Sequence, residues 1–207
     1  MTSSAAMTGP GRDHRPAPRA AARPLIFAEA MAAALWGFGE AVFFFIVVDV
    51  FITMIAAQGR LRAALAAALI ATAATLFGLW LIHAWSAGTS LKVIFAFLDV
   101  IPAISRDMLH HALADLRAHG VWTVAAGVLT GTPLKVYAAL APHAGVSLAA
   151  LLLVAAPLRL ARLVLVALLA HVAANVSRRL VPGLHPLWLW AGFWLISYGL
   201  WFAFMPG

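Results

Sequence analysis

The 207-residue chain contains no cysteine, and only 10% of its residues are charged. The lack of cysteine excludes a disulfide framework and thiol chemistry, and it leaves the redox compartment undetermined. The sequence also lacks the HExxH, GxSxG and P-loop motifs. Hydrophobic residues make up 64% of the chain, and the mean hydropathy is +0.97. Such a chain is too apolar for a soluble globule, so we predict an all-α polytopic membrane protein with one domain.

The few charged residues are mostly basic, and the formal net charge is +7. In a soluble protein this excess would suggest nucleic acid, but in a membrane protein it is typical of cytoplasmic loops and of contact with anionic lipid. Residues 1–24 combine prolines and arginines with low hydrophobicity. We expect them to form a disordered cytoplasmic tail, followed by a membrane core over residues 25–179 and a C-terminal transmembrane helix within residues 180–207.

Residues 34–53 are almost wholly apolar, yet they contain two carboxylates, Glu40 and Asp49. A carboxylate near the bilayer centre costs about 2.5–3.5 kcal/mol and marks a pathway or a binding site. On one continuous helix the two acids would face opposite sides, because nine residues rotate by about 180°. A fold back near residues 43–46 would bring both acids to one place, so we predict a re-entrant hairpin. The alternative is an ordinary tilted helix with two interfacial acids.

A second unusual segment, residues 121–141, is centred on Gly131, Thr132 and Pro133, with Lys135 two residues further on. Proline lacks an N–H group and clashes with the preceding turn, so a helix breaks or kinks here. A helix that restarts after Pro133 aims N–H groups at a bound anion, and Lys135 adds a positive charge. We therefore expect a second re-entrant hairpin with a phosphate-binding site. The alternative is a kinked span whose lysine reaches the interface.

Three further apolar stretches are long enough to cross a bilayer: residues 63–87, 147–174 and 186–204. The second contains Pro157, where we expect an interruption, and Arg159 and Arg162, which share one helix face. Arginines at that depth require partners, so we expect them to point toward the carboxylates, toward a ligand, or toward both. The predicted fold is thus a helical bundle with two opposed re-entrant hairpins and about three full spans.

Residues 88–120 form the polar middle section, in which residues 105–118 have the spacing of a helix along the membrane surface. His111, Asp115 and His119 fall on one face of this helix. We interpret them as exposed residues rather than metal ligands, because no motif spacing supports zinc. No metal and no other cofactor is expected.

The distribution of arginines indicates how the chain crosses the membrane. If both hairpins re-enter, from opposite faces, then the N-terminal tail, Arg60 and Arg62, and Arg178 and Arg179 all lie on the cytoplasmic side. Making either hairpin a full span would move at least one of these basic clusters outside.

Three stretches of the sequence together resemble the DedA family, also called VTT-domain or SNARE-associated proteins: GFGEAVFFFIVVDV, ATAATLFGLWLIHAWSAG and RAHGVWTVAAGVLTGTPLKVYAALAPHAG. The resemblance covers roughly residues 34–175. It implies two re-entrant helices that enter from opposite faces. It also implies movement of lipids such as undecaprenyl phosphate or phosphatidylethanolamine across the membrane, in some members coupled to the proton gradient. The family's two membrane acids correspond to Glu40 and, loosely, to Asp49.

The chain departs from the family pattern around the proline of the second hairpin. The family places arginines about three residues on either side, where this sequence has Thr130 and Val136. We infer that Arg159 and Arg162 replace these arginines.

We therefore predict a membrane lipid translocase, not an enzyme, in a bacterial cytoplasmic membrane. Its partners would be lipids with anionic headgroups, with protons as a coupling ion. The predicted site consists of Glu40, Asp49, Lys135, Arg159 and Arg162, with the hairpin break at Gly131 and Pro133. A proton-coupled transporter of small anions and a non-catalytic assembly protein remain alternatives, and the oligomeric state is left open.

Overall fold

The computed structural model describes residues 24–181 and 183–204, and within these ranges every regular element is a helix. The predicted all-α class is confirmed, whereas the predicted tail of residues 1–24 lies, apart from Pro24, outside the described residues. The main helices are α1 (Phe27–Val42), α2 (Asp49–Ala57), α3 (Leu61–Ala87), α4 (Leu91–Asp99), α5 (Arg106–His119), α6 (Thr123–Thr130), α7 (Leu134–Leu140), α8 (Leu148–Leu180) and α9 (Pro186–Phe204).

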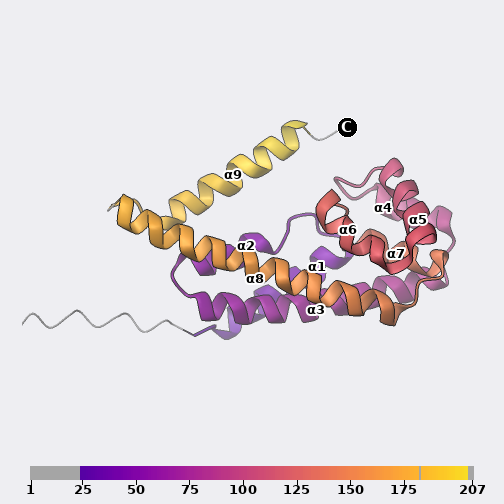
Figure 1. The fold of residues 1–207 in the computed structure, drawn as a ribbon, viewed down its shortest axis with the longest axis horizontal. Coiled ribbons are helices and arrows are strands. Elements are labelled where there is room, and N and C mark those ends of the chain that lie inside the picture. Colours follow the sequence, from indigo (N-terminus) through magenta and orange to yellow (C-terminus); the bar gives the residue numbers. More distant parts are fainter. Residues whose placement is uncertain (1–23, 182, 205–207) are drawn as a thin grey trace, which may run out of the picture.

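Helices α3, α8 and α9 are long and apolar enough to cross a membrane, with 27, 33 and 19 residues respectively. They correspond to the three predicted spans, which is typical of an integral membrane protein. One expectation is wrong, because α8 is not interrupted at Pro157 but continues to Leu180. A proline removes a single helical N–H group, and transmembrane helices tolerate it when neighbouring elements support the helix. Here α8 packs along both α2 and α3 (Figure 1).

The first apolar run is not one helix, because residues 43–48 separate α1 from α2. The indole nitrogen of Trp36 donates a hydrogen bond to the Ile46 carbonyl at 2.9 Å, and the Val48 amide donates to Glu40 Oε2 at 2.8 Å. The chain after α1 is therefore bent back against α1. The predicted break near residues 43–46 is confirmed, and the alternative of a single tilted helix is wrong.

Helix α1 packs against α3 at glycine positions. A Cβ atom on Gly37 would lie 2.5 Å from the Ala71 carbonyl oxygen, and one on Gly78 would lie 2.7 Å from the Cβ of Ala41. The Thr75 hydroxyl donates to the Gly37 carbonyl at 3.0 Å. The backbones can approach this closely only because neither glycine has a side chain.

The start of α1 is tied to the start of α3 by an ion pair. Arg60 Nη1 lies 2.6 Å from Glu29 Oε1. The hydrogen bond from Arg60 lowers the pKa of Glu29, against the opposing effect of partial burial. Glu29 therefore stays ionised at neutral pH, and the pair holds these two helix ends together.

The second break is also present: α6 ends at Thr130, and α7 begins at Leu134. Gly131 has a φ of +81°, a left-handed conformation that suits glycine at a helix C-terminus. The ring of Tyr137 on α7 lies directly against Gly127 on α6, where even a methyl group would collide with it. The break predicted at residues 131–133 is thus confirmed.

Helices α4, α5 and α7 share a core at the end of the molecule away from residues 58–60. Helix α5 begins after Ser105, whose hydroxyl accepts a hydrogen bond from the Met108 amide, and it buries Leu109 and Leu116. The helix predicted at residues 105–118 is confirmed, and His111 and His119 are exposed as expected. Helix α4 was not predicted.

Helix α9 is the least covered of the long helices, and its most apolar window has no buried residue. In Figure 1 it runs back at an angle from the C-terminal end of α8. The indole nitrogens of Trp190 and Trp194 both donate to the Thr53 hydroxyl on α2, at 3.1 and 3.0 Å. These bonds fix the first half of α9 to α2.

Candidate functional site

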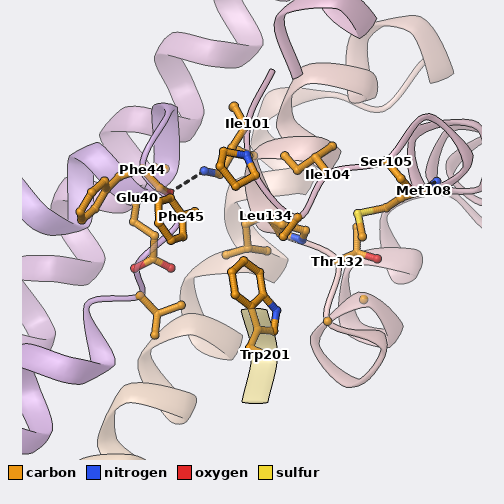
Figure 2. A pocket seen from close by; sticks show the side chains of 18 of the residues that line it. Glu40, Phe44, Phe45, Ile101, Ile104, Ser105, Met108, Thr132, Leu134 and Trp201 are labelled. Atoms are coloured by element: carbon orange, nitrogen blue, oxygen red, sulfur yellow. Dashed lines mark hydrogen bonds between the residues drawn. The ribbon is translucent and has the colours of Figure 1, made fainter. Parts of the chain in front are cut away.

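A cavity of about 1130 Å³ lies where the two helix breaks, α8 and α9 meet. Figure 2 shows Glu40, Phe44 and Phe45 at one side of the cavity and Ser105, Met108 and Thr132 at the other, with Trp201 of α9 between them. The loop between α4 and α5 completes the wall. The cavity therefore combines charged groups with a largely apolar, aromatic lining.

Glu40 and Arg159 form a nearly buried ion pair that lines this cavity. Arg159 Nη1 donates to Glu40 Oε1 at 2.8 Å, and Nη2 donates to Oε2 at 2.6 Å. The Arg159 side chain is 5% exposed and that of Glu40 is 14% exposed. Parallel hydrogen bonds of this kind are short and charge-assisted, so the pair links α1 to α8 firmly. Arg159 Nε is buried without a hydrogen-bond partner in the described part of the chain.

Asp49 and Arg162 form a second pair, three residues further along α8. Arg162 Nε lies 3.2 Å from Asp49 Oδ1, and Nη2 lies 3.4 Å from Oδ2. The carboxylate is 2% exposed, but the arginine side chain is 43% exposed. Asp49 is buried and is not one of the residues that line the cavity, whereas Arg162 is. This second pair is longer and more open than the first.

Lys135 lies in α7, close to the helix break. Its ammonium group donates to the Phe44 carbonyl oxygen at 2.7 Å, and the side chain is buried. The sequence predicts that this lysine belongs to a phosphate-binding site at the start of the helix after Pro133. In the structure, its ammonium group holds the turn after α1 and Lys135 also lines the cavity. Helix α7 also has only seven residues, so its dipole is weak.

The turn between α1 and α2 is held by two side chains from different helices. The Val48 amide donates to Glu40, and the neighbouring Val47 amide donates to the Tyr198 hydroxyl of α9 at 3.1 Å. Tyr198 and Glu40 therefore accept from consecutive amides of this turn. The chain places all five predicted charged residues around this turn, with Gly131 and Pro133 on the facing wall.

Sequence reasoning missed the contribution of α9, which it treated only as a span. Trp194, Tyr198 and Trp201 line the cavity, and Thr53 anchors the helix. One signal was available: Tyr198 is one of only two tyrosines in the chain and lies within an apolar run.

The arrangement can neutralise and hold an anion next to apolar surface. Two carboxylates and three cations leave one positive charge in excess. Among the described residues there is no group of three or more His, Asp or Glu side chains placed to bind a metal ion. Comparison of the chain with protein-family models, curated proteins and solved structures finds no significant match.

Proposed function

We propose that the protein is a lipid translocase that moves a phosphate-bearing lipid across the membrane. One observation supports this proposal above the others: Glu40, Lys135, Arg159 and Arg162 line a cavity whose other lining residues are mostly aromatic and aliphatic, and Asp49 is paired with Arg162 beside it. A lipid has the same division, with an anionic headgroup and apolar chains. Charged groups within apolar membrane segments mark substrate pathways by default.

The excess positive charge favours an anionic headgroup. Glu40 and Asp49 are already paired with arginines, so neither carboxylate is free to repel a phosphate. Lys135 donates to a backbone carbonyl rather than to a carboxylate, and its charge is the one in excess. A phosphate headgroup would neutralise that charge.

Glu40 is the residue that we propose as the proton-coupling group. It lines the cavity, whereas Asp49 is buried, is paired with Arg162 and does not line the cavity. A proton that arrives through the cavity can therefore reach Glu40. Protonation would weaken the bonds to Arg159 and to the Val48 amide, and the turn would be released. Asp49 is proposed to hold Arg162 in place.

We further propose that both helix breaks are re-entrant and that they enter from opposite faces of a bacterial cytoplasmic membrane. This arrangement, together with Glu40 and the break at Pro133, is what the resemblance to DedA proteins implies. The break at residues 43–48 and the break at residues 131–133 meet at the cavity, which supports the proposal.

The test is reconstitution into vesicles that carry a fluorescent phosphate-bearing lipid, followed by quenching from outside with an impermeant reagent. The wild-type protein should expose inner-leaflet lipid faster than protein-free vesicles do. Lys135→Ala should slow this transfer, while Lys92→Ala, which removes an exposed lysine outside the cavity, should not. Glu40→Gln should remove any dependence on a pH gradient. Wild-type vesicles that transfer no lipid faster than empty ones would rule out the translocase.

A further inference from the structure

Arg162 has unused hydrogen-bonding capacity at the cavity wall. Its bonds to Asp49 involve Nε and Nη2, at 3.2 and 3.4 Å, and 43% of the side chain is exposed. A guanidinium group has five N–H donors, so several remain for a second anion without breaking the pair with Asp49. Arg159, by contrast, is 5% exposed and directs both terminal nitrogens at Glu40.

Tyr198 supplies a second unused donor from the opposite element. Its hydroxyl oxygen accepts from the Val47 amide, and its proton has no acceptor within the described ranges of the chain. Tyr198 lines the cavity, and so do Glu40 and Arg162. A hydroxyl donor without an acceptor and a guanidinium group with unused N–H donors, both in the wall of one cavity, are suited to a bound anion.

Helix α9 is built to hold Tyr198 at this point. Trp190, Trp194 and Tyr198 recur every four residues, so they share one face of α9. The first two donate to the Thr53 hydroxyl of α2, and the third contacts the turn after α1. The Tyr198 ring also stacks on Trp194, with 5.7 Å between the ring centroids. The hydroxyl is thus positioned by three contacts along one helix face.

We infer that Arg162 and Tyr198 form a two-donor clamp for the phosphoryl group of an anionic lipid, so that α9 is part of the binding site. This inference rests on the proposed function and names the residues that recognise the headgroup. The guanidinium supplies charge-assisted hydrogen bonds with a planar geometry that matches phosphate oxygens, and the hydroxyl adds a neutral donor from the other side. The apolar side chains of α9 and of the loop between α4 and α5 receive the acyl chains.

The clamp is tested by measuring binding to the purified full-length protein in detergent with three probes: dihexanoyl phosphatidic acid, dihexanoylglycerol and inorganic phosphate. Arg162→Gln and Tyr198→Phe should each weaken binding of phosphatidic acid by about tenfold, the loss expected for one hydrogen bond to a charged group. Lys92→Ala serves as the control for a lost exposed cation and should bind like the wild type. Binding of dihexanoylglycerol, which lacks the phosphoryl group, should not change in any variant.

The three probes distinguish a headgroup clamp from a displaced helix and from a site for a soluble anion. Unchanged binding of phosphatidic acid in both variants would overturn the clamp, and so would an equal loss for dihexanoylglycerol, which would indicate a displaced α9. If inorganic phosphate bound as tightly as phosphatidic acid, the ligand of the site would be a soluble anion, and the lipid clamp would be overturned. If the wild-type protein transfers lipid but both variants bind phosphatidic acid normally, the clamp is refuted and the translocase is not. The reverse result, selective binding without lipid transfer, would refute the translocase and leave the clamp standing.

Discussion

Glu40 and Arg159 are joined by two hydrogen bonds of 2.8 and 2.6 Å in an almost fully buried setting. Removing one member of such a pair leaves the other charge buried and uncompensated, which costs about 3–5 kcal/mol. Exposed pairs contribute far less, because water and salt screen them. The Arg106–Asp99 pair, with side chains 69% and 32% exposed, provides the comparison within the same chain.

We therefore expect Arg159→Met to lower the free energy of unfolding by about 3–5 kcal/mol, measured by denaturant unfolding in detergent micelles. Arg106→Met should lower it by less than about 1 kcal/mol. Combining Arg159→Met with Glu40→Gln should recover part of the loss, because the buried negative charge is then gone. Equal losses for Arg159→Met and Arg106→Met would contradict the buried pair.

At the residue scale, the sequence identifies the charged members of the site but not how they pair. Glu40, Asp49, Arg159 and Arg162 are conspicuous because each is costly within an apolar segment. Their pairing depends on the turn at residues 43–48 and on how α8 faces it, which no local pattern specifies. Tyr198 is harder to find, since a hydroxyl in an apolar run does not indicate its partner.

Helices α1 and α3 are in contact through positions that only glycine fits. The Ala71 carbonyl oxygen, 2.5 Å from the Cβ that Gly37 lacks, belongs to the backbone and cannot rotate away. A Cβ atom on Gly199, in α9, would have no neighbouring atom within 4 Å. The two glycines therefore provide matched tests of close packing within membrane helices.

We expect Gly37→Val to lower the free energy of unfolding by about 1–3 kcal/mol, since α1 and α3 must separate to admit the side chain. Gly199→Val should change it by no more than about 0.5 kcal/mol. Denaturant unfolding in detergent measures both. A tolerated Gly37→Val with an unchanged unfolding midpoint would show that these helices do not depend on close approach.

At the element scale, long helices could be predicted and short ones could not. Helices α3 and α9 follow from apolar runs of spanning length. Helix α4, with only nine residues, lay within a segment treated as polar, and its burial comes from packing on α5 and α7. The continuity of α8 through Pro157 depends on support from α2 and α3, which is a tertiary effect.

For the whole molecule, basic residues gather at one end. Arg178, near the end of α8, donates to the Ala57 carbonyl at 3.3 Å, just before Arg60 and the start of α3. At the other end of α3, His83 contacts the Val146 carbonyl just before α8 begins. Helices α3 and α8 are therefore antiparallel, and both arginine clusters lie together. By the positive-inside rule we expect this end to face the cytoplasm.

Because the chain has no cysteine, its topology can be measured without removing native thiols. Gln58→Cys and Asp107→Cys place exposed thiols near opposite ends of α3. In intact cells an impermeant maleimide should label Asp107→Cys only, and Gln58→Cys should react only after the membrane is opened. Equal labelling of both variants in intact cells would contradict the arrangement of three spans.

The most direct test of the proposed function is to measure lipid transfer by a variant in which a large side chain fills the cavity. Ser197 lines the cavity from α9, whereas Leu195 is 74% exposed and does not line it. In vesicles with a fluorescent phosphate-bearing lipid, Ser197→Trp should reduce the transfer rate at least tenfold, and Leu195→Trp should leave it at the wild-type value. Transfer at the wild-type rate by a folded, inserted Ser197→Trp protein would contradict passage of the headgroup through this cavity.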